Sequence, residues 1–228
     1  MLTEETQGNK EEQKSSIKAV ILDFDGLLFN SEPVWARSYY KFLEIKKVKD
    51  NPEIHLKLIG RGLKDVVSIM KDVLGIEGEV DQLVDEYRKV FYELFFAKEN
   101  ILMPGAIEIV KKTKGKNLIV ALTTGGHTKK MAEKILEKVN LLNYFDLIVS
   151  SDDVDNGKPA PDVYFFVIEK LGFLSSQCLA FEDSVNGVVS AKAAGLRVFG
   201  VNPSENMREE LKEAGADEVF ASLKEIQL

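Results

Sequence analysis

Short apolar runs rich in β-branched residues, separated by stretches with helical spacing, constrain the fold of this chain more than any other feature. Runs of this kind are typical of strands that are buried on both faces of a sheet. Strands that alternate with helices predict βαβ units, so we expect an α/β protein with a Rossmann-like parallel sheet core that helices cover on both faces. The runs lie at residues 17–23, 117–122, 145–150, 177–181 and 197–201.

The pattern changes between the first and second runs, where no strand signal interrupts the helical periodicity. Apolar residues at i, i+3, i+4 and i+7 spacing predict helices over residues 63–74 and 80–95. A chain of 228 residues is long enough for a core and a smaller companion. We therefore expect an inserted all-α cap at residues 32–102, within an α/β core made of residues 17–31 and 103–228.

The composition of the chain indicates its cellular compartment and the kinds of partner that it can bind. Residues 1–16 carry mixed charges and no apolar segment, so we expect a mobile tail there. The 30 Lys and Arg residues against 37 Asp and Glu residues disfavour nucleic acid as a partner. Cys178 is the only cysteine, which favours a reducing compartment such as the cytoplasm, and no apolar run is long enough to span a membrane. Either a monomer or a weak homodimer is expected.

Polar residues follow the ends of the predicted strands. In an open parallel sheet, ligands bind at the carboxyl ends of the strands, so these residues are expected to converge on one edge. Two like charges about 4 Å apart repel by about 4 kcal/mol at an effective dielectric constant of 20, so four carboxylates require a compensating cation. The segments are Asp23-Phe24-Asp25-Gly26, Thr123-Thr124-Gly125-Gly126, Lys158-Pro159 and Glu182-Asp183.

The donor atoms of these segments favour Mg²⁺ as the cation. They are oxygen atoms, and the chain has only two histidines and no cysteine cluster that would suit zinc. Mg²⁺ that is held by few carboxylates completes its coordination with water and substrate phosphate. The sequence therefore predicts phosphoryl chemistry on a small phosphorylated molecule.

Four motifs resemble the ordered motifs of the haloacid dehalogenase superfamily. The resemblance covers nearly the whole chain after Ser16, and the helical insertion is similar to the α-helical cap of the β-phosphoglucomutase-like and sugar-phosphatase branches. It implies a Mg²⁺-dependent phosphatase that forms an aspartyl-phosphate intermediate. The motifs are D-F-D-G-L at 23–27, T-T-G-G at 123–126, G-K-P-A-P-D at 157–162 and F-E-D-S-V-N-G at 181–187.

The resemblance implies a role for each carboxylate. Asp23 would be the nucleophile, and an ordinary aspartate pKa near 3.9 would leave it ionised at neutral pH. Asp25 would protonate the leaving group, take a proton from the attacking water and face the metal with its backbone carbonyl. Asp23, Asp25 and Asp183 are the expected metal ligands. Glu182 is either a further ligand or a partner of metal-bound water.

The remaining motif residues are expected to hold the substrate. The Thr123 hydroxyl, Thr124 and the amides near Gly125 would bind the phosphoryl oxygens at the start of a helix. Lys158 would aim its ammonium group at the nucleophile and at the transferred phosphate. Arg61 lies between two glycines on a loop that faces the active site in similar enzymes, so we expect it to contact the substrate.

A few residues depart from the family pattern or have no fixed role in it. Asn30 stands where the first motif usually has an aspartate. Trp35 stands where the β-phosphoglucomutases carry a histidine that takes part in their cycle. His127 is expected at the surface, with a place in the pocket lining as the alternative. His55 is expected on the surface of the cap, and Cys178 inside a strand.

The sequence therefore favours hydrolysis of a sugar phosphate or a nucleotide-derived monophosphate. A β-phosphoglucomutase-like phosphomutase is the first alternative, although Trp35 disfavours it. A non-catalytic sensor of phosphorylated ligands is the second alternative, and the intact set of motif residues disfavours it. Asp25 disfavours a dehalogenase, because a halide leaving group needs no acid.

Overall fold

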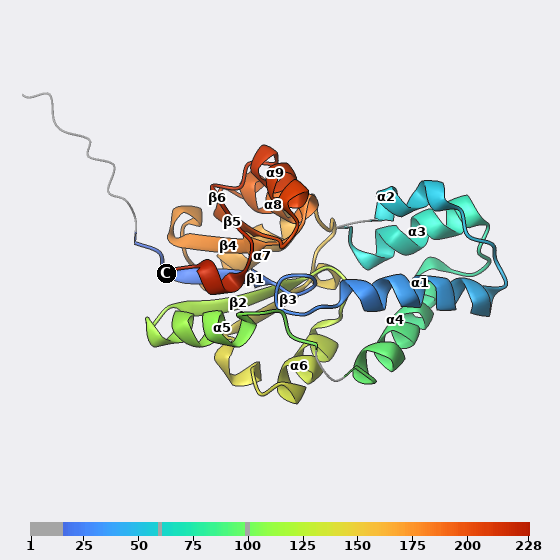
Figure 1. Ribbon diagram of the computed structural model, residues 1–228, viewed down its shortest axis with the longest axis horizontal. Helices are drawn as coiled ribbons and strands as arrows, with labels where there is room; N and C mark the ends of the chain where they lie inside the picture. Colours follow the sequence, from blue (N-terminus) through green and yellow to red (C-terminus); the bar gives the residue numbers. More distant parts are fainter. Residues whose placement is uncertain (1–15, 59–60, 99–100) are drawn as a thin grey trace, which may run out of the picture.

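A parallel sheet forms the centre of the computed structural model, which describes residues 16–58, 61–98 and 101–228 (Figure 1). Six strands pair in the order β3-β2-β1-β4-β5-β6 among these residues, and every pairing is parallel. The α/β fold class predicted from the sequence is confirmed. Apart from Ser16, the predicted tail lies outside the described residues. The strands are β1 (Ala19–Asp23), β2 (Ile119–Thr124), β3 (Leu147–Ser150), β4 (Cys178–Glu182), β5 (Arg197–Val201) and β6 (Glu218–Phe220).

Successive residues of the strands supply two hydrophobic layers. Val20 and Leu22 of β1 pack with α5 and α6, while Ala19 and Ile21 pack with α7, α8 and α9 on the other face. Figure 1 shows α5 and α6 on one side of the sheet and α8 and α9 on the other. These helices are α5 (Ala106–Gly115), α6 (Lys129–Lys138), α7 (Asp162–Leu171), α8 (Val185–Ala193) and α9 (Glu205–Glu213).

The sequence did not predict β6, the edge strand of the sheet. It has only three residues, which are exposed or half-buried, so it lacks the continuous apolar run that marks the other strands. Short 3₁₀ turns also join the elements: η1 (Pro52–Ile54), η2 (Leu142–Tyr144), η3 (Ser151–Asp153), η4 (Ser175–Gln177) and η5 (Leu223–Glu225).

Four helices form a cap beside the carboxyl ends of the strands. They pack around a hydrophobic cluster of their own, which includes Phe42, Met70 and Tyr87. Gly75 ends α3 in a left-handed conformation with φ of 71°, which a glycine adopts without strain. The helices predicted over 63–74 and 80–95 are confirmed. The cap helices are α1 (Glu32–Lys46), α2 (His55–Leu58), α3 (Leu63–Leu74) and α4 (Val80–Phe96).

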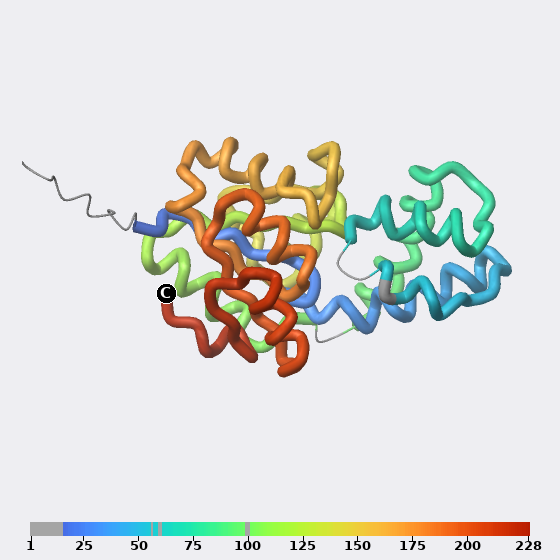
Figure 2. Tube along the Cα trace, turned by 90° about the horizontal axis from the view of Figure 1, so that it is seen from above, coloured from blue at the N-terminus to red at the C-terminus, as the bar shows by residue number. Residues whose placement is uncertain are grey.

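Two chain crossings connect the cap to the core. They lie side by side, because the Asn30 amide donates to the Ile101 carbonyl over 2.8 Å and the Met103 amide donates to the Leu28 carbonyl over 2.9 Å. The C-terminus and the first described residues lie at the end of the core that is remote from the cap (Figures 1 and 2). The exact domain boundaries stay a prediction. None of the helices in the described part of the chain is long and apolar enough to cross a membrane.

Candidate active site

The ends of three neighbouring strands place the motif residues together. Asp23 ends β1 and pairs in register with Thr123 near the end of β2, while Glu182 ends β4 on the other side of β1. Because the strands are parallel, their carboxyl ends open on the same edge of the sheet. The convergence of the predicted site residues at this edge thus follows directly from the strand order.

Lys158 joins the buried carboxylates. Its Nζ atom lies 2.5 Å from Asp23 Oδ1, 2.5 Å from Glu182 Oε1 and 3.4 Å from Thr123 Oγ1. Burial disfavours the charged lysine, but the carboxylates of Asp23 and Glu182 outweigh it and raise the pKa of Lys158 well above its ordinary value. Lys158 is therefore a fixed positive charge beside the proposed nucleophile.

The carboxylate of Asp23 differs from the ordinary aspartate that the sequence suggested. Burial raises the pKa of Asp23 to about 8, although Lys158 opposes the shift. Burial and the charges of Asp23 and Glu182 also raise the pKa of Asp183. The expectation of an unperturbed pKa near 3.9 was therefore wrong, because desolvation and neighbouring negative charges disfavour ionisation. A cation among these groups would favour their ionised forms.

The buried carboxylates of Asp23, Glu182 and Asp183 fit a cation. Each offers an oxygen atom, and these atoms all lie within 4.8 Å of one another. Glu182 Oε2 is buried and has no hydrogen-bond partner among the described residues. Two glycines leave room for the carboxylates, since a Cβ atom would lie 1.9 Å from Asp183 Oδ2 at Gly26 and 1.9 Å from Glu182 Oε2 at Gly187. An all-oxygen donor set of this kind suits Mg²⁺.

The side chain of Asp25 lies outside this acidic group. The Trp35 Nε1–H donates to Asp25 Oδ1 over 2.9 Å, and His127 Nε2 lies 3.2 Å from the same oxygen. Burial alone would raise the pKa of Asp25, but His127 and the hydrogen bonds from His127, Ser31 and Trp35 together lower it. Asp25 is therefore oriented by aromatic side chains and not by the cation site.

His127 corrects the prediction of a surface residue, because its side chain is completely buried. Its ring packs among Phe24, Trp35 and Phe91, and Nδ1 lies 3.3 Å from the Tyr92 hydroxyl. The sequence gives no signal that His127 contacts Asp25 from a buried position, because its ring is covered only when Trp35 and Phe91 of the cap pack on the core. Cys178, by contrast, is buried in β4 as expected.

The segment after β2 is a loop, not the immediate start of a helix. α6 begins at Lys129, with Thr128 as its N-terminal cap. The Thr124 hydroxyl accepts a hydrogen bond from the His127 amide over 3.2 Å and so shapes the turn. Gly125 lines the cavity described below, whereas Thr123 is buried next to Lys158.

The cap contacts the core directly around this loop. The Leu63 amide donates to the Gly125 carbonyl over 3.1 Å. Arg88 of α4 is buried and bonds both carboxylate oxygens of Asp152, over 2.9 and 2.8 Å, as well as the Gly126 carbonyl, over 3.2 Å. No sequence signal marks Arg88 as a residue of the site, because its partner lies 64 positions further along the chain.

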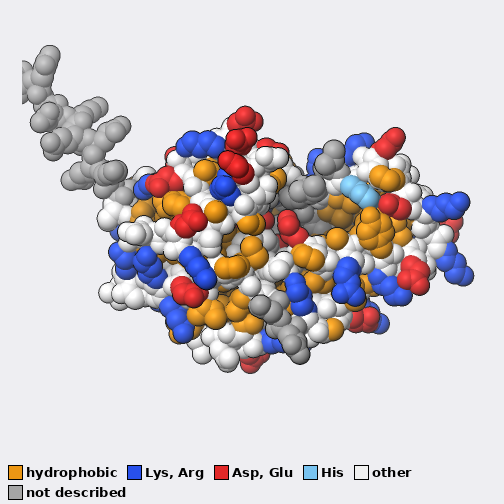
Figure 3. Space-filling model, in the orientation of Figure 1, with side chains coloured by type: hydrophobic (Ala, Val, Ile, Leu, Met, Phe, Trp, Pro, Cys, Tyr) orange, Lys and Arg blue, Asp and Glu red, His pale blue; other side chains and the backbone are white. Residues whose placement is uncertain are grey.

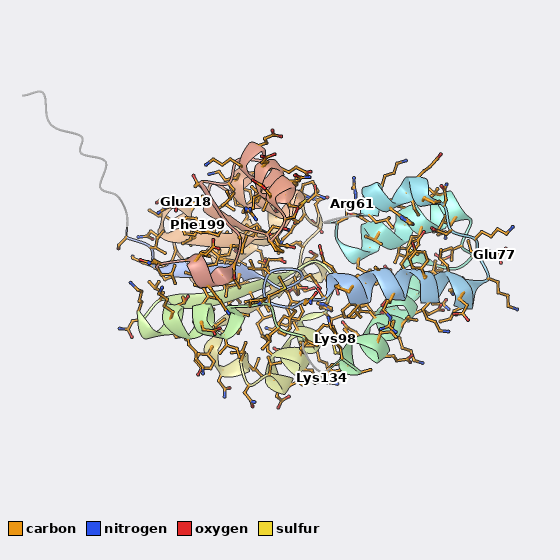
Figure 4. All side chains as sticks on the ribbon, viewed as in Figure 1. Arg61, Glu77, Lys98, Lys134, Phe199 and Glu218 are labelled. Carbon is orange, nitrogen blue, oxygen red and sulfur yellow. The ribbon has the colours of Figure 1, made fainter. Side chains whose placement is uncertain are left out.

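A cavity of about 440 Å³ lies between the cap and the core. Asp23, Asp25, Lys158 and Asp183 contribute to its lining from the core, and Arg61 from the cap. Figure 4 shows Arg61 between the two parts of the molecule. The other histidine, His55, lies on the cap as predicted and also lines the cavity.

Tyr164 is a further residue of the site that was not predicted from the sequence. It is buried on α7, and its hydroxyl donates to Glu182 Oε1, which Lys158 also contacts. The sequence offers no signal for this contact, because a tyrosine on a helix is ordinarily a packing residue. Tyr164 and Lys158 together hold one oxygen of Glu182 and leave the other for a ligand.

These features define a class of protein: a parallel α/β core that carries a lysine-bridged carboxylate site beneath a helical cap. The haloacid dehalogenase-like hydrolase family model matches residues 20–201, and the chain belongs to this family.

Known proteins similar to this chain include two phosphatases. The chain is 34% identical to the phosphorylated carbohydrates phosphatase of Thermotoga maritima over 221 residues. The aligned region covers 92% of this chain and 100% of that protein. The chain is 32% identical over 216 residues to hexitol phosphatase B of Escherichia coli, covering 92% and 94%. The crystal structure of CbbY from Rhodobacter sphaeroides in complex with phosphate is similar, with a TM-score of 0.80, 25% identity and coverage of 92% and 96%.

Proposed function

We propose that this protein is a Mg²⁺-dependent phosphatase that hydrolyses a small phosphorylated metabolite through an aspartyl-phosphate on Asp23. The observation that carries this proposal is the bridge from Lys158 to both Asp23 and Glu182 beside the three clustered carboxylates. The family match and the names of the similar phosphatases support it. The same comparisons favour a sugar phosphate or a related monophosphate as the substrate.

In the first step, an Asp23 oxygen would attack phosphorus while the bond from phosphorus to the leaving oxygen breaks. Asp25 would give its proton to that oxygen. Because its neighbours lower the pKa of Asp25, it is ionised in the free protein and would gain this proton with the negatively charged substrate. Lys158 would balance negative charge on the transferring group.

In the second step, Asp25 would take a proton from water, and the water oxygen would attack the phosphorus of the aspartyl-phosphate. The bond to Asp23 would break, releasing inorganic phosphate and restoring the carboxylate. Asp23, Asp183 and the backbone carbonyl of Asp25 would hold the Mg²⁺, with Glu182 as a further ligand or as a partner of metal-bound water. The ion would supply positive charge against the phosphate oxygens.

Trp35 argues against the phosphomutase alternative. Its indole N–H donates to Asp25 and has no lone pair with which to accept a proton. A time course with a hexose 1-phosphate and a bisphosphate activator separates the two activities, because a mutase yields the isomer before free phosphate. A predominance of isomer would overturn the phosphatase assignment.

The experiment that tests the proposal is a screen of phosphorylated metabolites and a generic aryl phosphate for phosphate release, with and without Mg²⁺. Asp23→Asn is expected to abolish release, since an amide cannot form the acyl-phosphate. Asp72→Asn is the matched control, because Asp72 is exposed on α3, and it should keep full activity. Phosphate release by Asp23→Asn at the rate of the unmodified protein would refute the proposal. Failure of the unmodified protein to release phosphate from any of these compounds would also refute it and would favour a non-catalytic sensor.

A further inference from the structure

The cavity above Asp23 has two chemically different halves. Its core side carries Asp23, Asp25, Lys158 and Asp183 and the glycines of the loop after β2. Its cap side is mainly aromatic and aliphatic, and Figure 3 shows hydrophobic side chains on the cap between α1 and α2, near the junction with the core. The apolar or aromatic cap residues that line the cavity are Trp35, Ala36, Tyr39, Tyr40, Leu58, Leu63, Val66 and Tyr87.

The polar atoms of three of these aromatic residues already have partners in the protein. The Tyr39 hydroxyl donates to Asp50 over 2.6 Å, and the Tyr87 hydroxyl donates to the Trp35 carbonyl over 3.4 Å. The Trp35 indole donates to Asp25 over 2.9 Å. Tyr39 and Tyr87 are also largely buried in the cap, so these side chains offer a ligand the ring edges that border the cavity and few hydrogen bonds.

The other polar cap residues of the lining are less enclosed. Arg61, Glu32 and Tyr40 are exposed, and His55 is half-buried with its Nε2 atom 3.0 Å from Asp50 Oδ1. A polyhydroxylated leaving group that lay against Trp35, Tyr39, Val66 and Tyr87 would lose hydrogen bonds to water without gaining protein partners on that wall. A planar aromatic ring makes few hydrogen bonds to water, so it would lose few of them on entering and would gain contact with the aromatic side chains.

We infer that the preferred leaving group carries a planar aromatic or heteroaromatic ring, which lies against the Trp35, Tyr39, Val66 and Tyr87 side of the cavity. This inference rests on the proposed phosphatase function and names the substrate class of the same site. The volume of about 440 Å³ falls in the usual range for pockets that enclose ligands larger than a phosphate group. A nucleoside 5′-monophosphate belongs to this class, with its phosphate at Asp23 and its base between the cap side chains.

The test compares substrates that share the sugar phosphate and differ at the anomeric carbon, which carries the base in one and a hydroxyl group in the other. Ribose 5-phosphate and the ribonucleoside 5′-monophosphates share the sugar and the phosphate, so the ratio of their kcat/KM values measures the contribution of the base. We expect the best nucleotide to exceed ribose 5-phosphate by at least about tenfold. An equal or lower value for every nucleotide, with ribose 5-phosphate turned over, would overturn the ring inference and leave the phosphatase function intact.

A pair of variants on α3 localises the effect. Val66→Asn puts an amide on the apolar side of the cavity and should lower the nucleotide preference about three- to tenfold. Val73→Asn is the matched control on the exposed face of the same helix and should leave the ratio unchanged. An unchanged ratio in a folded Val66→Asn protein would place the ring elsewhere and overturn the inference.

Intrinsic fluorescence gives a readout that needs no turnover. Trp35 is the only tryptophan of the chain and lines the cavity, so a stacked base should quench its emission. In metal-free buffer, we expect a nucleoside monophosphate to quench Trp35 at concentrations where ribose 5-phosphate does not. Equal quenching by the two would contradict the inference. Absence of phosphate release from any substrate, including an aryl phosphate, would instead contradict the proposed function.

Discussion

Gly187 provides a sharp test of how the site constrains the fold, because local and tertiary effects predict opposite results for Gly187→Ala. Gly187 lies in α8, where replacing glycine by alanine favours the helix by about 1 kcal/mol. In the folded protein, however, the new Cβ would lie 1.9 Å from Glu182 Oε2 and 2.2 Å from its Cδ. Atoms this close cannot coexist, so either Glu182 or α8 must move.

The cost of moving Glu182 follows from its contacts. Its side chain is completely buried, and Oε1 accepts hydrogen bonds from Lys158 and Tyr164. A hydrogen bond to a charged group contributes about 1.5–3 kcal/mol, so losing both would cost about 3–6 kcal/mol. After the helix gain of about 1 kcal/mol, we expect a net loss of about 2–5 kcal/mol in the free energy of unfolding.

Thermal and denaturant unfolding of the purified protein measure this loss. For a chain of this size, 1 kcal/mol shifts the melting temperature by about 2–4 °C, so the expected decrease is about 4–20 °C. Gly115→Ala is the matched control, because Gly115 ends α5 and a Cβ there meets no atom within 4 Å. A Gly187→Ala protein as stable as the unmodified chain would refute the reasoning, since it would show that Glu182 yields at no cost.

Three further predictions concern catalysis. Calcium in place of Mg²⁺ should inhibit phosphate release, because its larger and looser coordination misplaces Asp23, whereas full turnover in excess chelator would rule out a metal requirement. Arg61→Ala should lower kcat/KM for the best natural substrate by about 10- to 100-fold and barely change the hydrolysis of phenyl phosphate. An equal loss of kcat/KM on both substrates would instead assign Arg61 a structural or catalytic role. Trp35→Phe removes the N–H donor to Asp25 but keeps a ring beside Phe91, and we expect kcat to fall about tenfold. An unchanged kcat would show that His127 and Ser31 orient Asp25 without Trp35.

The sequence by itself determined the parallel sheet and the placement of the four motifs at one edge of it. Strands buried on both faces require continuous apolar runs, which are visible in one dimension. Three of these runs end at or next to a motif residue, namely Asp23, Thr123 and Glu182. Because parallel strands have their carboxyl ends on the same edge of the sheet, the sequence alone predicts that the three residues lie close together. Two cap helices, α3 and α4, were equally visible as apolar residues at helical spacing.

The tertiary structure decided the features that depend on side-chain contacts between distant segments. The surface assignment of His127 failed because Trp35 and Phe91 cover its ring only when the cap packs on the core. The pKa of Asp23 departed from its ordinary value because burial and neighbouring carboxylates act through space and not along the chain.

The character of the cavity is decided in the same way. Tyr39 and Trp35 could each offer a polar atom to a substrate, and the sequence gives no sign that Asp50 and Asp25 already hold those atoms. The motifs of a sequence thus determine which chemical groups meet at the strand ends, because strand direction fixes their side of the sheet. Which groups remain available to a ligand depends on the contacts that packing creates, and only the folded structure contains those contacts.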